Sequence, residues 1–212
     1  MPIILTEVRI MRKITAAIFG AAMILTLIIS GFIRDGRRLD ELRGSVLRLH
    51  ILADSDSERD QQLKLAVRDA LLEHSSELFT DCGSLEETER AAAEKLPEIV
   101  DIAEETLRSR GCTDGVTAEL ADVYFDERTY GDITMPEGTY RALRVKIGSA
   151  QGHNWWCVMY PPLCIPAACG AVTDDEDTEK AFFDSEERDI LYHPKRYRIK
   201  FALWDKIKEL AD

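Results

Sequence analysis

Cys157 and His153 are the two side chains whose types and spacing best suit nucleophilic catalysis. A cysteine nucleophile needs a base in space that lowers the pKa of its thiol. His153 lies in a connector with glycine and serine, whereas Cys157 lies inside an apolar run that prolines end, and a thiol buried in such a setting is inert. The sequence contains no phosphate loop, nucleophile elbow or HExxH motif. We therefore expect no enzyme activity, and a thiol-dependent hydrolase using this pair is the runner-up.

The other cysteines and histidines do not suggest a metal or cofactor site. The four histidines are scattered without metal-ligand spacing, and no C-x-x-C occurs. Five cysteines is an odd number, so at least one is unpaired or pairs between chains. Cys157 and Cys164 flank Pro161-Pro162 and form the candidate disulfide; two buried apolar thiols are the equal alternative. We expect no cofactor.

An uncharged apolar run, Ile14 to Ile33, follows Arg12 and Lys13 near the start of the chain. At about 1.5 Å per residue it is long enough to cross a bilayer, which predicts export, with residues 1–33 as a cleaved signal peptide or a membrane anchor. Both outcomes stay open. The whole chain has a net charge of −12. The first 33 residues carry +2, so the remaining residues carry −14. The acidic body argues against nucleic acid or anionic lipid as a partner, so we expect membrane contact only through the N-terminal segment.

The elements that position these residues follow from periodicity. Residues 34–44 are predicted as a charged linker, and Val46 to Ala53 as a strand with Arg48 and His50 on one face. Two helical stretches follow. The first is Glu58 to Phe79 after an N-cap at Ser57. The second begins at Leu85 after a capping box at Ser84, has a kink or two abutting helices near Leu96 because of Pro97, and ends at Gly111. The remaining predictions are a strand at Val116 to Phe125, a β-hairpin formed by Tyr140 to Tyr160 with a central strand at Trp155 to Tyr160, an irregular stretch at Ser185 to Pro194, and a C-terminal helix.

This pattern predicts an α+β fold. We expect a single domain in the order β-α-α-β-β-β with a C-terminal helix, preceded by an N-terminal hydrophobic export segment. The strand order and the oligomeric state do not follow from the sequence.

Two long stretches resemble the stage II sporulation protein R family of endospore-forming bacteria. The first lies within Leu47 to Leu72, and its matching positions are Arg48, His50, Ser55, Asp56, Asp60, Gln61, Lys64, Val67, Arg68 and Asp69. The second is the run G-H-N-W-W-C-x-x-x-P-P-L-C at Gly152 to Cys164, preceded by Tyr130, Pro136, Gly138 and Tyr140. Asp54 and Glu137 depart from the expected pattern, and the acidic segment from Thr173 to His193 does not align. The resemblance covers residues 45–165 and identifies 45–212 as the family's globular domain.

The resemblance implies a function without catalysis. Such proteins are exported from the forespore into the space between two membranes, where they activate a membrane-embedded aspartic protease that processes pro-sigma-E in the mother cell. The exposed edges of the two stretches would then contact the protease, at Arg48, His50, Asp56, Asp60, Lys64, Arg68, Asp69, Asn154, Trp156, Pro161 and Pro162. Among these, Asp56, Asp60, Lys64 and Arg68 are the better surface candidates, whereas Trp155, Val67, Leu143 and Val145 are expected in the core. A cell-envelope binding module is the other alternative.

Overall fold

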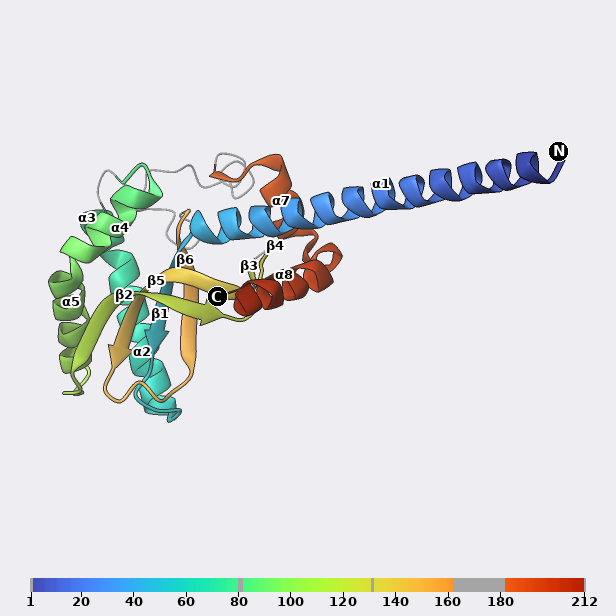
Figure 1. The fold of residues 1–212 in the computed structure, drawn as a ribbon. Coiled ribbons are helices and arrows are strands. Elements are labelled where there is room, and N and C mark those ends of the chain that lie inside the picture. Colours follow the sequence, from blue (N-terminus) through green and yellow to red (C-terminus); the bar gives the residue numbers. More distant parts are fainter. Residues whose placement is uncertain (1, 80–81, 131, 162–181, 212) are drawn as a thin grey trace. The chain divides into compact units, whose positions relative to one another are not determined.

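The computed structural model describes residues 2–79, 82–130, 132–161 and 182–211, with side chains from residue 11 onward (Figure 1). The chain forms two compact units. We call residues 1–40 with 195–212 the helical unit, and residues 41–194 the sheet unit. The mixture of helices and strands confirms the predicted α+β class.

Helix α1, Pro2–Gly44, makes up most of the helical unit together with α8, Arg198–Ala211. Within the described residues, α1 is the helix that is long and apolar enough to cross a membrane, by its length and composition. Large apolar side chains of its first part are exposed, including Ile18, Phe19 and Leu27, whereas Leu39 and Leu42 near its end are buried. The residues predicted as a linker, 34–44, are helical and continue α1.

A four-stranded sheet organises the sheet unit, in the order β2-β5-β1-β6. Its strands are β1 Leu47–Leu52, β2 Val116–Phe125, β5 Gly138–Ile147 and β6 Asn154–Tyr160. Strand β1 runs parallel to β5 and antiparallel to β6, and β2 is antiparallel to β5. The predicted hairpin is therefore wrong, because β1 lies between β5 and β6. Strand β6 is an edge strand of this sheet, and the central position belongs to β1, whose six residues are all buried.

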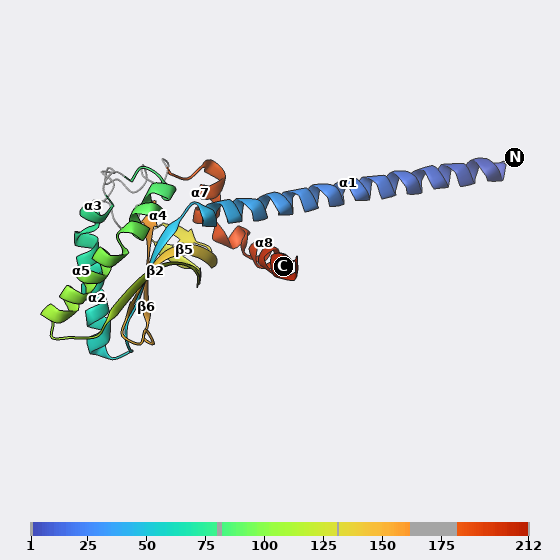
Figure 2. The same ribbon diagram turned by 60° about the vertical axis from the view of Figure 1, so that its left-hand side comes forward.

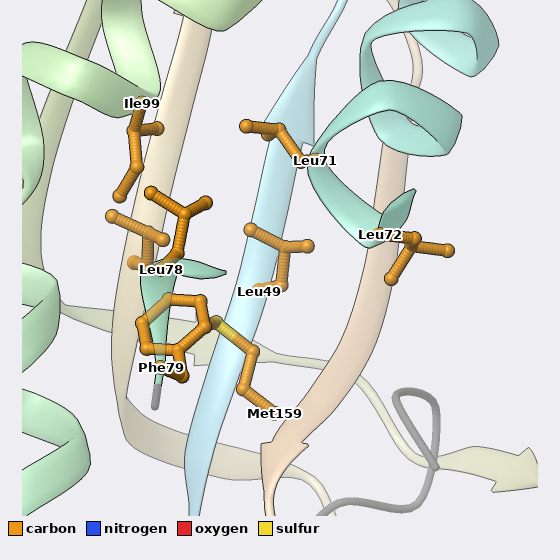
Figure 3. Close-up of a pocket in the computed structure, with 8 residues that line it drawn as sticks. Leu49, Leu71, Leu72, Leu78, Phe79, Ile99 and Met159 are labelled. Atoms are coloured by element: carbon orange, nitrogen blue, oxygen red, sulfur yellow. The ribbon is translucent and has the colours of Figure 1, made fainter. Parts of the chain in front are cut away.

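Four helices cover one face of the sheet (Figure 2). They are α2 Glu58–Glu73, α3 Ser75–Leu78, α4 Leu85–Glu94 and α5 Leu96–Ser109. Their apolar side chains form one core with alternate residues of the strands, among them Leu49, Leu143 and Val145. Val67 also lies in this core, and Trp155 packs half-buried against it, as predicted. A small apolar cavity of about 10 Å³ lies in this core between Leu49, Phe79, Ile99 and Met159 (Figure 3), and it is too small to hold a ligand.

Local signals set the helix ends as predicted. The Ser57 hydroxyl accepts a hydrogen bond from the Asp60 backbone N–H at 3.1 Å, and Ser84 caps α4 in the same way. Pro97 lies in the first turn of α5, so two helices meet near Leu96. Gly111 has φ +70° just after α5, the left-handed conformation that suits glycine. The first helix ends earlier than predicted, at Glu73, and the short α3 follows.

The second face of the sheet carries smaller elements. The segment between β2 and β5 contains a short hairpin of β3 Arg128–Tyr130 and β4 Ile133–Met135. Helix α7, Ser185–Tyr192, contacts β4 and buries Ile190 and Leu191. The irregular stretch predicted here is therefore wrong in part, because Asp184 and Glu187 form a capping box that begins a helix. A 3-10 turn, Pro194–Arg196, follows.

Candidate functional site

The two signature stretches meet where the loop after β1 contacts the loop between β5 and β6. The Ser149 N–H donates to the Asp54 carboxylate at 2.5 Å, and the Ser149 hydroxyl donates to the Asp54 carbonyl at 3.0 Å. The Gln151 N–H also donates to the Asp54 carbonyl, at 3.0 Å, and the Gly152 N–H donates to the Ala53 carbonyl at 2.9 Å. Backbone groups take part in each of these hydrogen bonds, which join two loops that lie almost 100 positions apart in the sequence.

Two glycines permit this close approach. Gly148 has φ +55°, and a Cβ there would overlap the Asp54 carboxylate. A Cβ on Gly152 would overlap the backbone carbonyl of Ser55, which cannot move aside as a flexible side chain can. The β5–β6 connection therefore has backbone requirements that glycine meets.

Asp56 and His153 form an exposed pair above this junction. The Asp56 carboxylate accepts hydrogen bonds from the His153 backbone N–H at 2.6 Å and contacts the ring Nδ1 at 2.5 Å. These hydrogen bonds lower the pKa of Asp56. The side chains are 56% and 80% exposed, so both are accessible to a partner.

Lys64 lies beneath the pair and is buried, so the prediction that it lies at the surface is wrong. Its ammonium donates to the Gln61 side chain at 2.6 Å and to the His153 carbonyl at 3.0 Å. Burial lowers the pKa of Lys64. Because its hydrogen bonds hold α2 against the β5–β6 loop, Lys64 supports the junction from the inside.

Arg68 continues the same side of α2 one turn further on. Its guanidinium lies 5.3 Å from the Trp155 ring centre and pairs with the Asp69 carboxylate at 2.6 Å. Arg68 is half-buried, and Asp69 is exposed. We call Asp56, Arg68, Asp69, His153 and Trp155 the signature surface, because both sequence motifs contribute to it.

Asp60 lies beside the signature surface, whereas Asn154 follows His153 at the start of β6 and interacts with His50 on the second face of the sheet. Asp60 accepts a hydrogen bond from the Ser55 hydroxyl, and the hydrogen bonds of Ser55 and Ser57 lower its pKa. Asn154 begins β6 and is exposed. Pro161 is buried, and Pro162 lies outside the described residues.

Arg48 lies on the second face of the sheet and is fully buried. The prediction that Arg48 lies at an exposed contact surface is therefore wrong. Its guanidinium carbon lies 4.0 Å from the Phe125 ring centre and 4.9 Å from that of Tyr140. Nη2 donates to the Tyr130 hydroxyl at 2.7 Å, whereas Nε and Nη1 have no hydrogen-bond partner among the described residues. Cation–π contacts therefore provide much of the compensation for this buried charge.

His50 shares that face and is 4% exposed, so it too lies away from the surface. Its ring packs edge-on against Phe125 and Trp156, at 5.6 Å and 6.1 Å between ring centres. Neither ring nitrogen makes a hydrogen bond to the described part of the chain. Burial lowers the pKa of His50 to about 4, with Asn154 opposing the shift and the cations of Arg144 and Arg48 adding to it. The imidazole is thus neutral at physiological pH.

Trp156 closes the same cluster. The Arg128 guanidinium, from β3, lies 4.9 Å from its ring centre, and the Phe125 ring packs edge-on at 5.3 Å. Tyr140 donates to the Pro136 carbonyl at 2.7 Å, and burial raises the pKa of its hydroxyl to about 12. The R-x-H part of the signature therefore belongs to an aromatic cluster in the interior.

The thiol-hydrolase alternative does not fit this arrangement. Cys157 is 1% exposed and disulfide-bonded, so it offers no thiolate, and His153 pairs with Asp56. Cys164, the predicted disulfide partner, lies outside the described residues, so that pairing stays a prediction. Across residues 2–79, 82–130, 132–161 and 182–211, no group of three or more His, Cys, Asp or Glu side chains could hold a metal ion.

Sequence reasoning missed the residues that connect the two stretches. Asp54 stands out in the sequence only as a departure from the family pattern, and Ser149 does not stand out. Phe125, Tyr130 and Tyr140 are not among the expected neighbours of Arg48. One signal was present: Arg48 and His50 alternate with apolar residues along β1, and aromatic residues recur on the strands that could cover that face. A cation and an imidazole facing aromatic rings indicate an interior cluster.

Comparisons with known proteins agree with this geometry. The family described as Stage II sporulation protein R (spore_II_R) matches residues 43–169, which include both signature stretches. The protein named Stage II sporulation protein R of Bacillus subtilis (strain 168) is 39% identical over 143 residues, covering 66% of this chain. The aligned stretch spans 64% of that relative, less than two thirds of its length. No solved structure matches. The chain therefore belongs to the stage II sporulation protein R family.

Proposed function

We propose that this protein is an exported sporulation signal that activates a membrane-embedded aspartic protease, which then processes pro-sigma-E in the mother cell. The family gives the chain a role in sporulation, and the observation that carries the proposal further is the exposed apolar helix α1 joined to a sheet unit of that family. An apolar segment of this length directs the following residues across a membrane. The proposed route is from the forespore into the space between its membrane and that of the mother cell.

The signature surface is the part of the sheet unit that we assign to the protease. It joins residues from both motifs and exposes Asp56, Asp69 and His153. Exposed ion pairs contribute about 1 kcal/mol or less to stability, so their arrangement need not serve the fold. A mixed-charge surface beside Trp155 is suited to a protein partner, because aromatic and charged groups together give both contact area and orientation.

The test is processing of pro-sigma-E in cells that make the pro-factor and its protease, with and without this protein. We expect mature sigma-E only when the protein is present. Replacing Leu25 and Leu27 together by arginine should abolish processing, because each arginine costs roughly 3 kcal/mol at the centre of an apolar segment. The control is Thr26→Val in the same apolar segment. It removes the hydrogen bond from the Thr26 hydroxyl to the Ala22 carbonyl and keeps the segment apolar.

A second set of variants tests the surface. We expect Asp56→Ala with Asp69→Ala to reduce processing by protein that is still folded at the temperature of the assay, which thermal unfolding checks. The matched control is Glu105→Ala with Arg108→Ala, which removes an exposed ion pair on α5. Processing that needs α1 but is unaffected by the first pair would place the protease contact elsewhere. No processing by a folded and exported protein would reject the signalling role and favour an envelope-binding module.

A further inference from the structure

Helix α8 carries an apolar stripe that the described residues leave open. Ile199 is 84% exposed and Leu203 52% exposed, and the stripe continues through Ile207 and Leu210. The spacing of three or four residues places all four on one side of the helix. Large apolar side chains gathered in this way on a helix surface indicate a binding face.

The segment around α8 is basic in an acidic protein. Residues 195–212 contain six basic and three acidic side chains, a net charge of +3, whereas the whole chain has −12. Lys195, Arg196, Arg198 and Lys200 are clustered at the start, with no acidic residue between them, and all four are exposed. A basic helix with an exposed apolar stripe is typical of segments that lie in the interface of a membrane with anionic lipids.

Contacts inside the helical unit hold the start of α8 beside the end of the apolar run of α1. The Lys200 ammonium donates to the Asp35 carboxylate at 2.6 Å, two residues after Ile33. The Trp204 ring lies edge-on to Phe32, 5.8 Å between ring centres, and its N–H donates to Asp40 at 3.0 Å. A Cβ on Gly36 would overlap the Trp204 ring, so glycine lets the ring lie against the α1 backbone. The start of α8 is therefore at the level where α1 leaves its apolar run.

We propose that α8 binds the membrane surface. Ile199 and Leu203 insert among the acyl chains of the leaflet at the carboxyl end of the apolar run, and the basic residues at 195–198 contact anionic phospholipid headgroups. The inference rests on the proposed membrane insertion of α1. The sequence-based expectation is that only the N-terminal segment meets the membrane and that anionic lipid is not a partner. The proposal differs because the expectation uses the total charge of the chain, which is negative although the C-terminal segment is basic.

A lipid surface fits α8 better than a second copy of the chain does. Two copies meeting through this face would bring two basic segments together, which costs electrostatic energy, whereas anionic headgroups neutralise them. The contacts to Phe32 and Asp35 also place the start of the stripe, at Ile199 and Leu203, near the end of the apolar run when α1 crosses a bilayer.

The experiment is photo-crosslinking of the full chain reconstituted in vesicles of phosphatidylcholine with phosphatidylglycerol. Leu203 is replaced by p-benzoylphenylalanine, and mass spectrometry identifies what the probe captures. Ile199 is the second probe position, which guards against a folding defect at either one. Glu209, exposed and roughly a quarter turn away from the stripe, is the negative control. Ile18, in the apolar run, is the positive control for α1.

We expect lipid adducts at positions 18, 199 and 203 but not at 209. The adduct at 203 should fall by roughly 25-fold in the double variant Lys195→Glu with Arg198→Glu, because each of the two cations near an anionic surface contributes about fivefold. It should fall by at least as much in pure phosphatidylcholine, which has no net charge to attract either cation. Lys206→Glu, outside the basic cluster, should have a smaller effect. Capture of a second chain or of the sheet unit at both 199 and 203 would overturn the proposal. Lipid at 18 without lipid at 199 or 203 would reject the role of α8 alone, and no lipid at 18 would reject the membrane insertion of α1.

Discussion

Replacing His50 by phenylalanine should remove much of the acid sensitivity of the sheet unit. The imidazole is buried against Phe125 and Trp156, and burial holds its pKa at about 4, below the usual 6.5. In the unfolded chain the ring takes up a proton near its usual pKa, whereas in the folded chain it stays neutral. Phenylalanine keeps an aromatic ring in this cluster and does not titrate.

The direction and size of this change in the free energy of unfolding follow from the linkage between proton binding and folding. Between about pH 6.5 and pH 4 the unfolded state binds more protons than the folded state, so the free energy of unfolding falls as the pH falls. A shift from 6.5 to about 4 corresponds to a total loss of about 3 kcal/mol, of which about 2 kcal/mol is lost between pH 7 and pH 5. Above the unfolded pKa the contribution is fully present.

The assay is urea unfolding of the full chain in a non-ionic detergent, followed by tryptophan fluorescence at pH 7 and at pH 5. Asp56, Asp60 and Glu119 have lowered pKa values, so their protonation in acid also lowers the free energy of unfolding. Both proteins contain these three carboxylates, so their effect is the same in each. The difference between parent and His50→Phe therefore isolates the imidazole. An equal loss of stability in the two proteins between these pH values would refute the account of a neutral, buried His50.

Three other substitutions test the fold that supports the site. Arg48→Met keeps the volume between the aromatic rings without the charge, so in chemical unfolding it should be at least about 2 kcal/mol more stable than Arg48→Ala, which leaves a cavity; equal losses would contradict this. Gly152→Ala should cost about 1–3 kcal/mol because its Cβ meets the Ser55 carbonyl. Gly115→Ala, with nothing within 4 Å, is its control, and similar unfolding midpoints would exclude the close approach. Ser57→Ala should lower the free energy of unfolding by about 1 kcal/mol through loss of the α2 cap, and an unchanged value would show that the cap contributes nothing.

The features that local chemistry determines were predictable from the sequence. The caps at Ser57 and Ser84, the junction at Pro97 and the turn at Gly111 depend on residues within a few positions of one another. The strand pairing does not, and this is why the hairpin prediction is wrong. The residues from Gly148 to His153 can connect adjacent strands, but they are also enough to cross one intervening strand at about 4.8 Å per strand spacing.

In the candidate site, too, features set by nearby residues could be predicted and features set by distant residues could not. Exposure of Asp56 and Asp69 could be predicted, because an aspartate is rarely buried unless a partner compensates its charge. The burial of Arg48, His50 and Lys64 could not, since it depends on which distant aromatic rings and loops cover them. Lys64 is buried by the β5–β6 loop, whose position depends on the same long-range strand order.

The place of β1 in the sheet has a consequence for when the protein can fold. Both neighbours of this strand come late in the chain, since Leu47 pairs with Arg141 on one side and Tyr160 on the other. A chain that crosses a membrane from its N-terminus delivers β1 long before either neighbour, so the sheet cannot close until most of the protein has emerged. Helices α2 to α5, whose contacts are more local, are available earlier. If the sheet unit is exported as we propose, this topology delays its folding until translocation is nearly complete, and the chain stays in a state that a translocation channel can pass.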